Sequence, residues 1–204
     1  KRQPIDSAKM IRLMTTNDID TCLTEPMKNN GIKSLYIPTT AGTGAEATKS
    51  SVFYINEKDK MSIANLDFLP DYVILDSSLL NTLPLYQRKV TSLDALCHSI
   101  ESYWSVKATD ESREYAKKGI LGFFENKNGY IKNTPDGNEG MLWASYYGGK
   151  AINITGTTAA HAMCYNITMN CSVSHGHSVA CDLSVIWEYM MTVSYTHLRA
   201  HETS

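Results

Sequence analysis

Four side chains of this sequence could together bind a divalent metal ion. Asp94 and His98 are four positions apart in a segment, residues 91–105, whose apolar side chains recur at helical spacing. Residues four apart lie on one face of a helix, so this carboxylate and this imidazole can converge on one ion. His161 and His175 follow downstream. One carboxylate and three imidazoles suit a divalent transition metal with a position left for substrate.

Neither half of this set is specific on its own. A lone Asp-x-x-x-His pair on a helix is more often a surface pair or a cap. A histidine in an apolar run, such as His161, is more often a core residue with a satisfied ring. The ligand types permit zinc as well as iron, because softness and geometry suit both. A loop of small residues further upstream supports the interpretation of these four residues as a metal site.

This loop, residues 39–46, is rich in glycine and threonine and directly follows a short strand predicted over residues 34–38. Small residues let a ligand approach the backbone, while hydroxyls and N–H groups can bind phosphate or ribose oxygens. A simple glycine turn explains the same residues equally well. Lys60, at the charged tip of a hairpin predicted over residues 51–63, could reach a phosphate or point into solvent.

The elements that must position these groups change in character near Pro84. Before it, the sequence predicts an opening helix, short strands and a central strand over residues 71–76. After it, the apolar pattern is helical. We therefore expect an α/β domain over residues 1–83 and a helical domain over residues 84–192.

The composition restricts the classes of partner. The chain has 204 residues and a net charge of −2, without a basic stripe, which argues against nucleic acid and anionic membrane surfaces. No run of 18 apolar residues is present, so no membrane span is expected. The five cysteines form no Cys-x-x-Cys pair, which is typical of a reducing, cytoplasmic location.

Taken together, these motifs resemble those of the iron-containing (group III) alcohol dehydrogenases. The resemblance covers roughly residues 4–191 and rests on motifs in matching order, namely Pro4-Ile5-Asp6-Ser7-Ala8-Lys9, residues 38–46, Leu69-Pro70-Asp71, residues 94–101, His161 and residues 175–177. Residues 100–106 and 109–112 resemble the phosphonoacetaldehyde reductase-like branch. Enzymes like 1,3-propanediol and butanol dehydrogenases remain open.

The resemblance implies a fold and a set of site residues. The fold is a partial dinucleotide-binding α/β domain followed by a partial helical metal-binding domain, as in the dehydroquinate synthase-like and group III alcohol dehydrogenase fold. The implied ligands of Fe2+, or of Zn2+, are Asp94, His98, His161 and His175. The implied contacts of NAD or NADP are Asp6, Thr39, Thr40, Thr43, Lys60 and Leu83. His177 is implied as the catalytic histidine near the nicotinamide or the substrate.

The implied reaction is the NAD(P)-linked dehydrogenation of a small alcohol or reduction of an aldehyde. Hydride would pass between the nicotinamide and the substrate carbon, with the metal acting as a Lewis acid. A homodimer is the assembly to consider for the full-length parent. The alternatives are a glycerol dehydrogenase-like zinc enzyme and a catalytically inactive, truncated metal-binding fragment. A dehydroquinate synthase-like relative would need lysines and arginines around the metal, which the sequence does not offer.

Both ends depart from the family pattern. Lys1-Arg2-Gln3 stands where the family carries a Gly-Gly-Gly-Ser phosphate turn, so we expect weakened pyrophosphate binding. Residues 193–204 resemble translated sequencing-adapter read-through and are expected to be a non-native tail. His197 and His201 in that tail are therefore not expected to bind metal. The sequence as a whole predicts a chain truncated at both ends.

Overall fold

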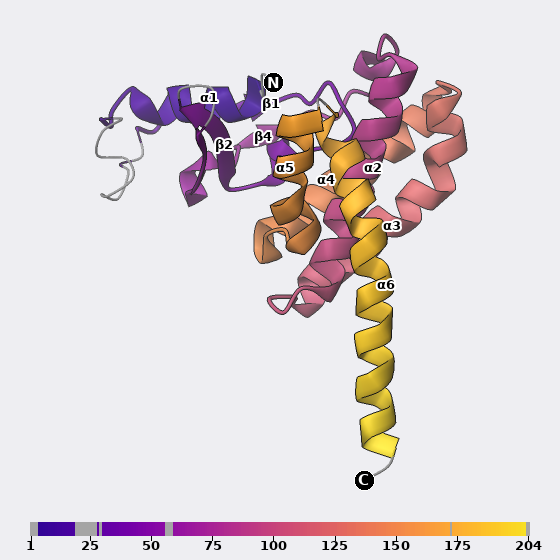
Figure 1. The fold of residues 1–204 in the computed structure, drawn as a ribbon. Coiled ribbons are helices and arrows are strands. Elements are labelled where there is room, and N and C mark those ends of the chain that lie inside the picture. Colours follow the sequence, from indigo (N-terminus) through magenta and orange to yellow (C-terminus); the bar gives the residue numbers. More distant parts are fainter. Residues whose placement is uncertain (1–3, 19–27, 29, 56–58, 172, 203–204) are drawn as a thin grey trace.

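A computed structural model describes residues 4–18, 28, 30–55, 59–171 and 173–202 of the chain. Figure 1 shows helix α1 (Pro4–Met14) and the strands at one side of the molecule and the long helices at the other. The α/β part thus precedes the helical part, as the sequence predicts. Among the described helices, none combines the length and apolar character needed to cross a bilayer.

Within the described residues, the strands form two small two-stranded sheets. β1 (Leu35–Tyr36) pairs in parallel with β4 (Tyr72–Val73), so the strands predicted over residues 34–38 and 71–76 are present but only two residues long. β2 (Ser50–Ile55) pairs antiparallel with β3 (Asp59–Ala64), which confirms the predicted hairpin.

The prediction that Lys60 lies at the hairpin tip is wrong. Its backbone belongs to β3 and is paired with Tyr54, because the ladder continues as far as Ile55 and Asp59. The Lys60 side chain lies outside the described residues. Its contact with a phosphate stays a prediction.

In the part of the chain that the structure describes, three short 3-10 helices connect these elements. They are η1 (Ala45–Ala47), η2 (Leu66–Phe68) and η3 (Ser77–Leu80). Asp76 caps η3, because its Oδ1 accepts a hydrogen bond of 2.9 Å from the backbone N–H of Ser78. The chain then turns at Pro84 into the first long helix.

Three long helices form the core of the helical part. α2 (Leu85–Trp104), α3 (Asp110–Ile131) and α4 (Pro135–Thr155) pack together around buried residues that include Leu80, Met141 and Leu142. Thr109 and Ser112 form a capping box that fixes the start of α3. Thr134 caps α4, whose first residue is a proline with no N–H to leave unpaired.

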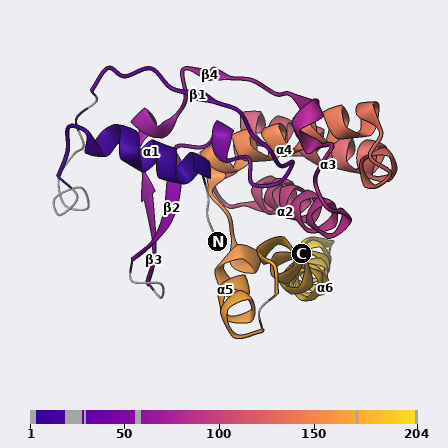
Figure 2. The ribbon, with the colours of Figure 1, turned by 90° about the horizontal axis from the view of Figure 1, so that it is seen from above.

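Two further helices complete the fold. Figure 2 shows α5 (Ala159–Cys171) and α6 (His175–Glu202) lying side by side next to α2. Apolar residues of the three helices form a second core of Cys97, Ala160, Cys164, Val179 and Leu183. In Figure 1 the far end of α6 extends away from the body. That end includes residues 193–202, so the backbone of the predicted tail is helical up to Glu202.

The first helix is fastened to the strand part by a buried lysine. Lys9 is fully buried, and its ammonium group donates hydrogen bonds to the carbonyl oxygens of Ala45 (2.7 Å), Thr48 (2.8 Å) and Ser50 (2.8 Å). Ser51 Oγ also donates a hydrogen bond to the carbonyl oxygen of Asp6. These bonds hold α1 against η1 and the start of β2.

Glu46, buried in η1, should make stability depend on pH. Burial raises its pKa to about 7. Between about 4.5 and 7 the folded state then retains a proton that the unfolded state has released, so stability falls as pH rises through this range. The free energy of unfolding should fall by up to about 3 kcal/mol over this pH range in the wild type, and Glu46→Gln should not show this fall. Urea unfolding of both proteins between pH 5 and 8 measures it. A difference between them that stays constant across this range would contradict the prediction.

Candidate metal centre

Helix α2 supplies the first two residues of the site. Asp94 and His98 are one turn apart and both buried, at 4% and 6% exposure. The Nε2 atom of His98 lies 4.0 Å from Asp94 Oδ1. The helical spacing in the sequence thus brings this pair onto one face, which is turned toward the interior.

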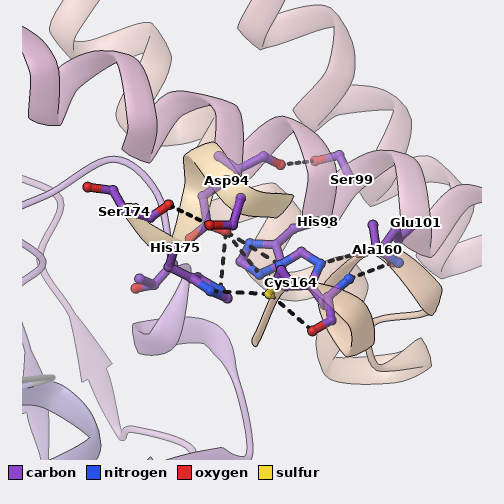
Figure 3. A network of polar contacts seen from close by, with 12 residues as sticks. Asp94, His98, Ser99, Glu101, Ala160, Cys164, Ser174 and His175 are labelled. Atoms are coloured by element: carbon purple, nitrogen blue, oxygen red, sulfur yellow. Dashed lines mark hydrogen bonds and ion pairs between the residues drawn. The ribbon is translucent and has the colours of Figure 1, made fainter. Parts of the chain in front are cut away.

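Helices α5 and α6 bring two further imidazoles to the same carboxylate oxygen. Nε2 of His161 lies 3.4 Å and Nε2 of His175 lies 3.7 Å from Asp94 Oδ1. Figure 3 shows the side chains of Asp94, His98 and His175 turned toward one another. One donor atom each of Asp94, His161 and His175 lie within 4.8 Å of one another. The His98 ring stacks on that of His161, with centroids 4.5 Å apart.

The geometry and the unsatisfied atoms of this cluster fit a divalent metal. Two ligand atoms about 2.1 Å from one ion in tetrahedral geometry lie about 3.4 Å apart, which is close to the observed separations. Within the part of the chain that the structure describes, buried Asp94 Oδ1 and His161 Nε2 make no well-formed hydrogen bond. Buried polar atoms without a partner are costly. A cation among them would satisfy both atoms.

The Asp94 carboxylate is surrounded by three imidazoles, which shift its pKa, and the pKa values of His98 and His161 are shifted in turn. Burial opposes ionisation of Asp94, but His98 and the two other imidazoles hold its pKa well below the usual range. Burial lowers the pKa of His98 to about 4. Burial also opposes the charged form of His161, but the carboxylates of Asp94 and Glu101 outweigh it and raise its pKa to about 9. These neighbours therefore keep the Asp94 carboxylate ionised, which is the form that binds a metal.

The approach of α6 to α2 depends on a glycine next to His175. A β-carbon at Gly176 would lie 2.0 Å from the carbonyl oxygen of Val90 and 3.0 Å from Asp94 Cβ. Only glycine therefore lets the two backbones come this close. The close approach holds His175 beside Asp94.

Glu101 is a member of the site to which the sequence assigned no role. It is fully buried on α2, and Oε2 contacts the Nδ1 atom of His161. The available signal was its spacing of seven residues from Asp94, about two helical turns. Its partner is 60 positions away in sequence, which spacing alone does not reveal.

A cleft of about 530 Å³ joins this cluster to the strand part. Its lining includes Asp6 of α1 and Thr43, Thr48, Ser50 and Ser62 from the strands and loops that follow, and Asp94, His98, His161, Tyr165 and His175 from the later helices. The loop that carries Thr43 packs directly on α4, because a β-carbon at Gly149 would lie 2.5 Å from the carbonyl oxygen of Gly44. The α/β part therefore contributes hydroxyl-bearing side chains to the cleft that the cluster also lines.

The other residues implied by the resemblance lie in different places. Among the described residues, Thr39, Thr40 and Leu83 are not part of the cleft lining. Thr39 is exposed, whereas Thr40 and Leu83 are half-buried. His177 is exposed on α6, two positions from His175, so the two rings do not share a face. The assignments of these four residues stay predictions.

The chain matches known proteins in two consecutive parts. Residues 3–77 match the family described as iron-containing alcohol dehydrogenase, and residues 89–202 match the C-terminal part of the Fe-containing alcohol dehydrogenase family. Phosphonoacetaldehyde reductase of Streptomyces viridochromogenes is 29% identical over 161 residues, covering 78% of this chain and 41% of that protein. The probable alcohol dehydrogenase EutG of Escherichia coli is 30% identical over 192 residues, covering 91% of this chain and 48% of that protein.

Solved structures share the fold. A sulfoacetaldehyde reductase from Bifidobacterium kashiwanohense in complex with NAD+ has a TM-score of 0.81 at 25% identity, covering 86% of this chain and 48% of that one. An iron-containing alcohol dehydrogenase from Thermotoga maritima has a TM-score of 0.77 at 28% identity, covering 86% and 49%. The chain spans about half the length of the curated relatives it matches. Since the two family matches extend over most of its sequence, the chain belongs to the iron-containing alcohol dehydrogenase family.

Proposed function

We propose that this chain carries the metal site of an NAD(P)-linked alcohol dehydrogenase or aldehyde reductase. The proposed ligands of Fe2+, with Zn2+ as the alternative, are Asp94, His98, His161 and His175. One observation carries the proposal: three imidazole Nε2 atoms lie 3.4 to 4.0 Å from a single buried carboxylate oxygen. Such a convergence is characteristic of a metal shell.

The chain's own residues would hold the substrate and the nicotinamide in the cleft. When bound, the metal would act as a Lewis acid toward the oxygen of an alcohol or aldehyde. Thr43, Thr48 and Ser50 also line the cleft, and their hydroxyls could orient a nicotinamide ribose or amide. Holding the nicotinamide beside the substrate carbon would supply the proximity that hydride transfer requires.

The nucleotide is proposed to be NAD or NADP. The related sulfoacetaldehyde reductase was solved with NAD+. Two of the residues named from the resemblance, Asp6 and Thr43, line the cleft. A small aldehyde of the type reduced by phosphonoacetaldehyde reductase is the proposed substrate class, because that enzyme is among the relatives. A cytoplasmic location and a homodimeric parent remain part of this proposal.

Metal content and turnover of the purified chain test the proposal. We expect one Fe2+ or Zn2+ per chain after anaerobic loading, measured by elemental analysis. NADH or NADPH oxidation should then follow addition of phosphonoacetaldehyde or a short aldehyde. Stable binding of zinc alone, with glycerol oxidation, would favour the glycerol dehydrogenase-like alternative. Metal binding without any turnover would favour an inactive metal-binding fragment, and absence of metal binding would contradict the site itself.

A further inference from the structure

Glu101 connects the helix that bears Asp94 to the start of the helix that bears His161. It lies on α2, about two turns after Asp94, so both carboxylates occupy one face of that helix. Its side chain is fully buried. The reaction proposed above gives this carboxylate no part, yet both of its oxygens make polar contacts. Its two oxygens make different contacts.

Oε1 of Glu101 accepts hydrogen bonds from several donors at the start of α5. It accepts hydrogen bonds from the backbone N–H of Thr158 (3.0 Å), from Thr158 Oγ1 (2.6 Å) and from the backbone N–H of Ala160 (3.0 Å). The backbone N–H of His161 adds a longer one of 3.4 Å. The first N–H groups of a helix have no partner within it, so this oxygen caps α5. An oxygen that faces four donors is an unprotonated acceptor.

Oε2 of the same carboxylate contacts Nδ1 of the His161 ring. Because an ionised carboxylate can only accept, Nδ1 must carry the proton. With Nδ1 held protonated, Nε2 is the nitrogen that can give up its proton to a metal, and it is the atom 3.4 Å from Asp94 Oδ1. The Glu101 side chain thus contacts both the backbone N–H and the ring of His161 and determines which ring nitrogen carries the proton.

We propose that Glu101 is a positioning residue, which holds His161 in the orientation and tautomer that bind metal through Nε2. This inference rests on the proposed metal site. The competing explanation is that Glu101 only caps α5. The two explanations differ in what the Oε2 contact does, since a cap needs only Oε1.

Two substitutions separate these explanations. Glu101→Gln keeps an oxygen that can cap α5 but presents an amide N–H to Nδ1, which favours the tautomer with its proton on Nε2. Thr158→Val removes the hydroxyl that donates to Oε1 and accepts from Trp104 Nε1, while leaving the carboxylate–imidazole contact intact. The first changes the tautomer and keeps the cap, whereas the second weakens the cap and keeps the tautomer.

The test is an anaerobic titration of both variants and the wild type with Co2+, followed by visible absorption. We expect Glu101→Gln to weaken Co2+ binding about 10- to 100-fold, the usual effect of losing an outer partner of a ligand. Thr158→Val should keep the wild-type affinity and spectrum. In the metal-free proteins, the melting temperature should fall more in Thr158→Val than in Glu101→Gln.

The outcomes are distinguishable. Affinity of Glu101→Gln within about twofold of wild type, or losses that parallel the melting temperatures, would overturn the inference. A wild type that binds no Co2+ would overturn the metal site and the inference together. If Glu101→Gln does not fold, 15N spectra of the zinc-loaded wild type decide. The inference requires a protonated Nδ1 and a metal-bound Nε2 at His161, and the opposite assignment overturns it.

Discussion

Asp94→Ala is expected to abolish stable metal binding. The Nε2 atoms of all three imidazoles face one oxygen of this carboxylate, and the variant removes that oxygen and its charge. The loss should exceed about 100-fold, because even an outer partner of a ligand contributes about 10- to 100-fold to affinity. A titration with Fe2+ or Co2+, read by calorimetry or absorption, measures the change.

Asp110→Ala is the matched control for this substitution. Asp110 is an exposed aspartate in the first turn of α3 and is not part of the cleft lining. The same charge is removed, so a general electrostatic effect would appear in both variants. Metal affinity that is retained in Asp94→Ala, or lost equally in Asp110→Ala, would contradict the assignment of Asp94 as a ligand.

Arg88→Met is expected to destabilise the fold more than any surface change. Arg88 is 2% exposed on α2, and its guanidinium lies 4.9 Å from the centroid of the Tyr130 ring. It donates hydrogen bonds to five acceptors, which are the carbonyl oxygens of Leu80, Leu83 and Tyr130 and the side-chain oxygens of Asn133 and Asn138. Methionine fills similar space but removes all five bonds. The oxygens of Leu80, Tyr130 and Asn133 then keep the N–H donors of Leu83, Asn133 and Asn138. We expect the free energy of unfolding to fall by at least about 3 kcal/mol.

Urea unfolding measures this loss, and Arg113→Met provides the comparison. Arg113 is about half exposed and lies 3.7 Å from the fully exposed Asp110 carboxylate, so its ion pair is screened by solvent. Its replacement should change stability little. A loss below about 1 kcal/mol in Arg88→Met would mean that water satisfies the acceptors of the buried cluster.

The sequence could predict the parts of the site that are set locally. The spacing of Asp94 and His98 requires only that residues 85–104 form a helix, which they do. The change from strands to long helices near Pro84 follows from periodicity, and the family and fold class predicted from the motifs are confirmed. These features depend on neighbours in the chain, so pattern alone reveals them.

The contributions of α5 and α6 could not be predicted from spacing. Residue type makes His161 and His175 possible ligands, and the resemblance implies that they are ligands. Their approach to Asp94 depends on how two later helices fold back on α2, which spacing does not reveal. The contacts of Glu101 could not be predicted from spacing either, since its partners begin 57 positions further along the chain. The prediction of strand length fails for a related reason. β1 and β4 pair over only two residues, and the pairing partner sets this length.

The distance in sequence between the groups of the metal site has a consequence for folding kinetics. Glu101 and His161 are 60 positions apart, so their contact requires closure of a long loop. A half-formed chain would offer only the α2 pair to an ion. Bound metal should therefore act late, on the native state, and slow unfolding more than it speeds folding. The ion would thus prolong the lifetime of the folded chain without guiding how it forms.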